Sequence, residues 1–268
     1  IHLVLLVPMA VLTPAAPCPI CGERSSALAA KRLPRFVFCS ECGGYFLLFP
    51  PPLPDYQPEY FEEKSAPSAF SKLSRPFLNA FLDRKVRRIR DLLRGTAPGR
   101  VLDYGAGSGM LVSALRMRGI DGVGYDPSPG AVTVASRTGI PVNGVLPSGQ
   151  FDLIMFWHSL EHVDDPLAVI RRVRPLLNPG GRLVVAVPNA ASWEAAIAGE
   201  RWFHYDYPFH RVHFTPQAIE ALLTRAGFHI VALDFFNPEY TVSGLVQTFL
   251  NFFLPKNALY YIVSHRRG

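Results

Sequence analysis

Two aspartates and three glycines near residue 105 have the types and spacing to bind a nucleoside. Gly105, Gly107 and Gly109 stand at alternate positions directly after an apolar stretch, and Asp103 precedes the first of them. Glycine permits positive φ and lets a ligand approach bare backbone. Asp126 ends a second short apolar stretch, and an acid at the tip of the second strand of a βαβ unit accepts hydrogen bonds from ribose hydroxyls. The pattern therefore predicts a strand, a glycine turn and a helix that together hold a nucleoside.

Four cysteines near the N-terminus form two C-x2-C pairs with seventeen residues between them. This spacing is typical of a structural zinc site, and the glycine after each pair suits a tight turn that aims both sulfurs at one ion. The alternatives are two disulfides, which need an oxidising compartment, and a redox C-x-x-C, which favours a βαβ context that is absent here. We therefore expect a structural Zn²⁺ bound by Cys18, Cys21, Cys39 and Cys42.

Two histidines and a glutamate lie together in a run that follows a strongly apolar stretch. His158, Glu161 and His162 match H-x-x-E-H, the inverted zinc-protease motif. That chemistry needs the residues on a helix, whereas this run separates a buried strand from a helix cap. Two interpretations remain: Glu161 and His162 order the loop through hydrogen bonds, or a histidine orients an acceptor or acts as its base. His158 and His162 are the candidate catalytic residues.

A second dense group of aromatic residues and histidines lies between the fifth expected strand and the next helix. In doubly wound sheets, an insertion at the carboxyl edge borders the substrate crevice. Stacked rings and imidazoles suit a planar or sugar-like acceptor, whereas the alternative is a packed loop whose histidines bond backbone carbonyls. Metal binding by the three histidines is a third interpretation. The candidate acceptor-binding residues are Trp202, His204, His210 and His213.

The elements that must position these groups alternate between strands and helices. The run from Phe151 to Trp157 is almost wholly apolar, as expected for a strand covered on both faces. The alternation predicts an α/β fold with a doubly wound, mostly parallel sheet. The expected strands are 101–104, 121–126, 141–145, 151–157, 182–187 and 229–233, and the expected helices are 77–94, 110–118, 131–137, 165–177 and one that begins at Thr215.

Changes in composition and a proline-rich stretch divide the chain into four parts. Its 268 residues, 49% of them hydrophobic, suffice for one full α/β domain and a small extra module. Tyr56, Tyr60 and Phe61 follow a proline-rich stretch, and they either pack on the main domain or cover its site. We expect a zinc-ribbon-like module at 13–50, a linker at 51–76, the nucleoside-binding domain at 77–236 and an apolar tail at 237–268.

Charge and the apolar tail bear on the partners of the protein. The formal net charge is +6, but the excess lies mainly on expected helix faces, so we do not expect a nucleic-acid partner. The tail ends with Arg266 and Arg267, and Pro255 interrupts it, so neither half is long enough to span a bilayer. It either packs on the domain or lies on a membrane surface.

The glycine pattern also separates nucleoside classes. Met110 stands where a dinucleotide fingerprint has its last glycine, so a nicotinamide site fits poorly. Together with Asp103 and Asp126, the G-x-G-x-G turn resembles class I S-adenosylmethionine-dependent methyltransferases. The block from Phe151 to Pro166 and the stretch from Leu176 to Asn189 resemble their UbiG-like, Methyltransf_23 branch, as does the paired-cysteine ribbon ahead of the domain.

The resemblance implies a Rossmann-like fold and transfer of a methyl group to an O, N or C nucleophile. The glycine turn would pass under the methionine moiety, with Asp103 near its amino group and Asp126 on the ribose. Trp157 would face the methyl group. The acceptor would be a small molecule, a glycan or a lipid-linked intermediate. The implied residues for S-adenosyl-L-methionine are Asp103, Gly105, Ala106, Gly107, Gly109, Asp126, Pro127 and Trp157.

Two departures from the family pattern and two competing functions stay open. Family members often carry an acid for the adenine amine where this chain has Asn143-Gly144, so that contact is expected from backbone. The family sheet has a seventh, antiparallel strand without a candidate here, so we expect a truncated chain or a tail that docks elsewhere. We expect a cytoplasmic protein, with peripheral membrane contact as the alternative. The competing functions are a non-catalytic binding module and an RNA-modifying methyltransferase.

Overall fold

The computed structural model describes most of the chain. The described residues are 17–24, 27–29, 33, 35–52, 58, 60–61, 69–93, 99–235 and 238–256. Residues 13–16 of the expected cysteine module, Tyr56 and the terminal arginines lie outside them.

The main sheet has five parallel strands in the order β6-β5-β4-β7-β8. The direction of winding reverses between the central strands β4 and β7, and doubly wound sheets bind their ligands at the carboxyl ends of the strands at such a reversal. Strands β4 and β7 are buried because their sequences are mainly apolar. The strands are β4 (Arg100–Tyr104), β5 (Asp121–Tyr125), β6 (Val142–Asn143), β7 (Phe151–Trp157) and β8 (Leu177–Ala186).

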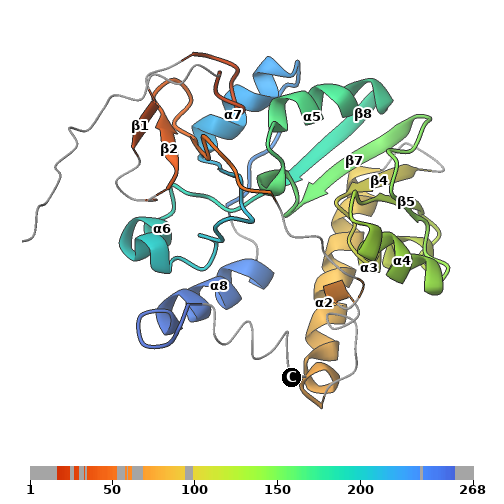
Figure 1. Cartoon of the computed structure of the whole chain (residues 1–268). Helices are drawn as coiled ribbons and strands as arrows, with labels where there is room; N and C mark the ends of the chain where they lie inside the picture. The colour runs from red at the N-terminus through yellow and green to blue at the C-terminus, as the bar shows by residue number, and fades with distance from the viewer. Residues whose placement is uncertain are drawn as a thin grey trace, which may run out of the picture.

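Helices cover both faces of this sheet (Figure 1). On one side lie α2 (Ala69–Leu92), α3 (Met110–Arg116) and α4 (Pro129–Arg137), and on the other lie α5 (Pro166–Val173) and α7 (Pro216–Arg225). The helix caps follow the sequence: Asp165 accepts from the backbone N–H of Ala168, and Thr215 accepts from that of Ala218. Short 3₁₀ helices are η1 (Leu160–His162), η2 (Arg174–Leu176) and η3 (Gly199–Arg201).

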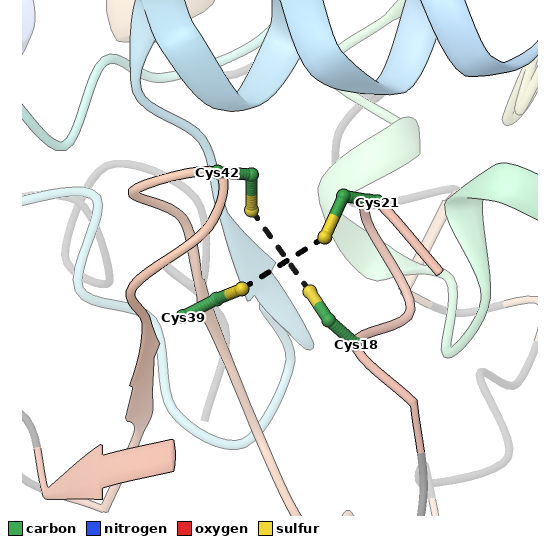
Figure 2. Close-up of side chains that lie close together, drawn as sticks. All are labelled: Cys18, Cys21, Cys39 and Cys42. Carbon is green, nitrogen blue, oxygen red and sulfur yellow. Dashed lines mark hydrogen bonds between the residues drawn. The ribbon is translucent and has the colours of Figure 1, made fainter. Parts of the chain in front are cut away.

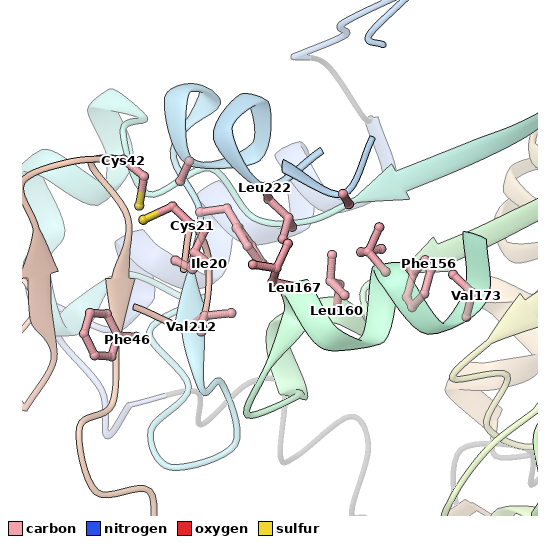
Figure 3. Close-up of a cluster of buried hydrophobic side chains, with 14 of the residues drawn as sticks. Ile20, Cys21, Cys42, Phe46, Phe156, Leu160, Leu167, Val173, Val212 and Leu222 are labelled. Atoms are coloured by element: carbon pink, nitrogen blue, oxygen red, sulfur yellow. The ribbon is translucent and has the colours of Figure 1, made fainter. Parts of the chain in front are cut away.

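The cysteine module is joined to the main domain through a second sheet. Its strands β1 (Ala27–Ala29), β2 (Val37–Cys39) and β3 (Tyr45–Phe46) continue into β9 (Val212–His213), which comes from the segment before α7. Figure 3 shows the shared core, which runs from Cys42 and Ile20 past Val212 to Leu167 and Phe156. The module therefore has no separate core among the described residues.

The described part of the C-terminal tail, residues 238–256, contacts α6 (Trp193–Ala198) and the segment that follows it. Its helix α8 (Pro238–Leu250) buries polar side chains, and the hydroxyl of Thr248 donates to Glu194 at 2.9 Å. The same oxygen accepts from the backbone N–H of Phe203, and the Asn251 amide donates to the carbonyl of Arg201 at 2.9 Å. Among the described residues, no helix has the length and apolar character that crossing a bilayer demands.

Most predicted elements are confirmed, and four predictions are wrong. Strand β8 begins at Leu177, five residues before its predicted start, so the predicted stop at Asn178–Gly181 lies within the strand. Helix α2 begins at Ala69, eight residues before the predicted start, so part of the predicted linker is helical. Helix α5 ends at Val173 and the chain continues as the 3₁₀ helix η2, because Pro175 has no N–H to donate to the carbonyl of Arg171. The predicted strand 229–233 is an irregular segment, and its apolar residues Val231 and Leu233 are 87% and 55% exposed. Because no other element in the described part of the chain covers these apolar side chains, forming a strand here would bury little apolar surface.

Candidate active site

The glycine turn after β4 has the conformation that the sequence predicted. Gly105, Gly107 and Gly109 have φ of 82°, 54° and 81°, values that favour glycine. The backbone N–H groups of Gly105 and Ala106 both donate to the carbonyl of Tyr125, at 2.7 and 3.0 Å. A Cβ at Gly105 would lie 2.4 Å from that of Ser159. The turn is therefore packed against the end of β5 and the loop after β7.

Asp126 is built into this turn. One carboxylate oxygen accepts from the backbone N–H of Gly107 at 2.8 Å, and the other accepts from that of Ser128 at 2.9 Å. Burial raises the pKa of Asp126, and these two hydrogen bonds oppose the rise. Each oxygen retains a second lone pair, so the carboxylate can also accept from two adjacent hydroxyls. Pro127, which follows it, is exposed.

Asp103 lies buried beneath the turn, at 4% exposure. Burial raises its pKa to about 7, a rise that Lys85 opposes and Asp126 reinforces. The ammonium of Lys85, on α2, also lies 4.7 Å from the centre of the half-buried Trp157 ring. The sequence interpretation missed Lys85 because it belongs to a charged stretch that resembles an ordinary solvated helix face.

Phe61 belongs to the same site. Its ring packs with Ala131 and Val134 of α4, and a Cβ at Gly107 would lie 3.8 Å from it. Tyr60 meets the Phe61 ring edge-on at 5.1 Å. The predicted packing of these aromatics on the domain is thus found beside the nucleoside turn itself.

The candidate catalytic histidines lie on the loop after β7. The Nδ1 of His158 is 3.3 Å from one carboxylate oxygen of Glu161, and the His158 backbone has a positive φ of 52°. The His204 ring stacks on the His158 ring with centroids 6.3 Å apart. The Nδ1 of His162 is 3.1 Å from the carbonyl of Phe209. The structure therefore brings His158, Glu161, His162 and His204 together.

Glu161 is the most buried member of this group, at 1% exposure. Burial by itself would raise its pKa, but the hydrogen bond to His158 and the proximity of His162 hold the pKa below its ordinary value. The Glu161 carboxylate is thus ionised, and its contact with Nδ1 holds the His158 ring in one orientation. Its motif lies on a loop and the 3₁₀ helix η1, not on an α-helix, which agrees with rejecting the protease interpretation.

The other predicted acceptor residues are packed inside the molecule. Trp202, His210 and His213 are 1%, 6% and 1% exposed, and His204 is half-buried. Burial lowers the pKa of His204 and of His213 to about 3 and lowers that of His210, so these imidazoles are neutral. Of these four residues, His204 is therefore the most exposed.

Two groups of side chains have the composition and spacing of metal sites. The four cysteine sulfurs point at one centre (Figure 2), with Cys18 and Cys42 3.9 Å apart and Cys21 and Cys39 3.8 Å apart. Thiolates placed tetrahedrally at zinc–sulfur distances of about 2.3 Å are separated by about 3.8 Å. The sulfurs are unlinked and buried, so the residues fit structural zinc and not the disulfide alternative.

The second group combines a carboxylate with two imidazoles. Glu161, His162 and His210 offer ligand atoms that all lie within 4.8 Å of one another. One Glu161 oxygen and Nδ1 of His210 are buried without a hydrogen-bond partner. The predicted trio of His204, His210 and His213 is not the set that the structure brings to metal-binding distance among the described residues.

The sequence of this chain is similar to those of known methyltransferases. Residues 77–233 match Methyltransf_23, described as a methyltransferase domain. A ubiquinone biosynthesis O-methyltransferase of Azorhizobium caulinodans is 31% identical over 178 residues, 58% of this chain and 70% of that protein. Its counterpart from Xanthomonas euvesicatoria is 31% identical over 153 residues, 50% of this chain and 64% of that protein.

A solved S-adenosylmethionine-dependent methyltransferase from Archaeoglobus fulgidus is 22% identical and covers 63% of this chain and 79% of its own, with a TM-score of 0.49. The family match extends from within α2 past α7 and includes every strand of the main sheet. The chain therefore belongs to the Methyltransf_23 family of S-adenosylmethionine-dependent methyltransferases.

Proposed function

We propose that the chain transfers a methyl group from S-adenosylmethionine to a hydroxyl oxygen of a small-molecule acceptor. The observation that carries the proposal is the His158–Glu161 pair at the carboxyl end of β7, beside the nucleoside turn. The relatives named for O-methylation in ubiquinone biosynthesis support a hydroxyl acceptor of low molecular weight. We propose the same class of acceptor here.

Different residues of the protein would bind different parts of the methyl donor. Asp126 would hold the ribose diol, Asp103 and Lys85 would face the charged end of the methionine moiety, and the glycine turn would support it. S-adenosylmethionine supplies a methyl group that is already activated by its sulfonium. Alignment of the acceptor oxygen with that methyl is then the main demand on the protein.

His158 would act as the base. Its Nδ1 lies 3.3 Å from the Glu161 carboxylate, which favours the tautomer with the proton on Nδ1, so Nε2 would be the basic nitrogen that takes the hydroxyl proton. The new carbon–oxygen bond forms as the carbon–sulfur bond breaks, and the sulfur keeps the electron pair. Glu161 would stabilise the imidazolium that results, because its buried carboxylate carries the opposite charge.

The substitution His158→Asn tests this role. The turnover number should fall by about 10²–10⁴-fold, since the base is lost, while affinity for S-adenosylhomocysteine stays within about twofold. Turnover on a panel of hydroxylated aromatic acceptors and calorimetric binding are the two measurements. His229→Asn, an exposed histidine in the irregular segment, is the matched control.

A metal-assisted step is the alternative favoured by the Glu161–His162–His210 group. A divalent ion there would activate the hydroxyl directly. In that case His210→Asn should abolish turnover as completely as His158→Asn does. If His210→Asn leaves turnover unchanged, the base interpretation is supported and the metal route is excluded.

Asp103 should make cofactor binding depend on pH. Since burial raises the pKa of Asp103 to about 7, its carboxyl is largely protonated below that pH in the free protein. The ionised form would attract the cofactor's ammonium, so affinity should rise by about tenfold from about pH 6 to about pH 8. Calorimetry across this range should show the rise in the wild-type chain and a flat profile in Asp103→Asn. An equal rise in the variant would exclude this role.

The proposal extends to an acceptor carried on a lipid surface. Four apolar side chains of α6, of the adjacent α8 and of the turn after α8 are between 63% and 72% exposed: Trp193, Ile197, Phe249 and Phe253. Exposed aromatic and aliphatic side chains of this size insert into the interface of a bilayer. Phe249→Ser with Phe253→Ser should reduce co-sedimentation with phospholipid vesicles by about fivefold. Val145→Ser with Val231→Ser, at exposed apolar positions elsewhere, should not, and equal losses would contradict the proposal.

A further inference from the structure

The cysteine module is bonded to the segment that carries the candidate acceptor residues. In the shared sheet, Tyr45 pairs with His213 and Phe46 pairs with Val212. The next backbone N–H of the module, from Leu47, donates to the carbonyl of Arg211 at 3.0 Å. The position of β9 is therefore set by the strand that leaves the second cysteine pair.

Arg211 connects this strand to the candidate catalytic loop. Its backbone N–H donates to the carbonyl of Glu161 at 2.7 Å. Its buried side chain, 4% exposed, donates to the carbonyl of Pro51 at 2.6 Å and faces a carboxylate oxygen of Asp164 at 3.2 Å. One residue thus joins the exit of the cysteine module to both ends of the Glu161–Asp164 turn.

Ring contacts reinforce the connection. The Phe36 ring lies 4.6 Å from the His213 ring and 5.7 Å from the Tyr205 ring. Phe36 and Leu47 of the module share one buried cluster with Trp202 and Tyr205. Loosening the module would therefore uncover the core beneath the whole 202–213 segment.

We propose that the zinc-bound module is a positioning device for the Glu161–His158 pair, with Arg211 as the positioning residue. The four thiolates would fix the ion, and the ion would fix β2 and β3, which hold β9 and Arg211. The backbone bond from Arg211 then sets Glu161, whose carboxylate orients His158. This inference rests on the proposed function only for the role of His158, since the structural connection stands without it.

The connection predicts a selective effect of metal loss. The nucleoside turn and Asp126 bond to β5 and to one another, and these hydrogen bonds involve no residue of the module. Releasing the ion should thus loosen residues 159–165 and 211–214 while cofactor binding is retained. A structural zinc that merely stabilised the fold would loosen both regions alike.

The experiment compares the full zinc-loaded chain with Cys39→Ser and Arg211→Met by amide hydrogen exchange. Exchange at residues 159–165 should rise by about tenfold or more in both variants, while exchange at 101–126 stays within about twofold. Affinity for S-adenosylhomocysteine should change by less than about threefold, and metal analysis should find the zinc absent in Cys39→Ser only. Arg225→Lys is the control, because Arg225 pairs with Glu23 of the same module at an exposed site away from Glu161.

Arg211→Met keeps the test decisive if Cys39→Ser does not fold, because methionine retains the apolar stem and the Asp164 side chain that it leaves unpaired is 66% exposed to solvent. With an active acceptor, turnover should fall by about tenfold with the KM for S-adenosylmethionine unchanged, and Arg211→Lys should restore part of it. Unchanged exchange at 159–165 in Arg211→Met would overturn the proposal. Because exchange is measured without an acceptor, that outcome is distinct from failure of the proposed methyl transfer.

Discussion

Replacing Asp126 by alanine should weaken the binding of S-adenosylmethionine by about 10²–10³-fold, since hydrogen bonds to a charged group contribute about 1.5–3 kcal/mol each. The carboxylate would lose two contacts to the ribose. It would also lose the bonds that it accepts from the backbone N–H groups of Gly107 and Ser128, which order the turn. Calorimetric titration of the folded variant measures the loss.

Asp121→Ala is the matched control because Asp121 begins the strand that Asp126 follows. Its side chain is about half exposed and pairs with Arg100 and Arg116. Exposed pairs contribute about 0–1 kcal/mol, so this variant should bind the cofactor within about twofold of the wild type. A loss of similar size in both variants would show that Asp126 has no specific part in the nucleoside site.

Gly105→Ala should destabilise the chain by about 3–4 kcal/mol. A side chain at a φ of 82° costs about 1–2 kcal/mol. The new Cβ would also lie 2.4 Å from that of Ser159, whose buried hydroxyl donates to the Tyr104 carbonyl at 2.6 Å. Moving Ser159 would break that bond and displace the neighbouring His158.

Gly139→Ala separates the two causes. Gly139 has a similar φ of 69°, but a Cβ there would meet nothing within 4 Å, so only the backbone cost of about 1–2 kcal/mol should appear. Urea unfolding of both variants without cofactor gives the comparison. Equal destabilisation would mean that Ser159 moves aside at no cost and that the close packing under the turn is unimportant.

Local patterns predicted the parts of the fold that local physics determines. The apolar run of β7 and the alternate glycines each require one backbone conformation, and the structure has it. The four cysteines were likewise predicted from spacing alone and do point at one centre. In the strand, in the turn and within each cysteine pair, the residues that fix the geometry are neighbours in the sequence.

Contacts between distant segments were beyond the sequence. The predicted strand at 229–233 has a suitable composition, but burial depends on neighbours that composition does not reveal, and its apolar residues are exposed. The pairing of β3 with β9 joins residues that are far apart in the chain, so no local sequence pattern predicts it. Arg211 was missed for the same reason, because its backbone bond to Glu161 joins distant segments.

The histidines illustrate the limit most directly. Their density near Trp202 suggested an acceptor site, yet His213 is 1% exposed and packs against Phe36 of the cysteine module. The pair of His158 with Glu161 follows from their spacing, whereas the proximity of His210 to Glu161 follows only from the fold. The roles of these residues in methyl transfer stay predictions.

A crystal structure of the zinc-loaded chain with S-adenosylhomocysteine tests the central claim most directly. The account predicts the ribose diol on Asp126, the homocysteine moiety over the Gly105–Gly109 turn near Asp103, and the sulfur facing Trp157 and His158. A ligand bound elsewhere, or no binding by the folded chain at saturating concentration, would contradict it.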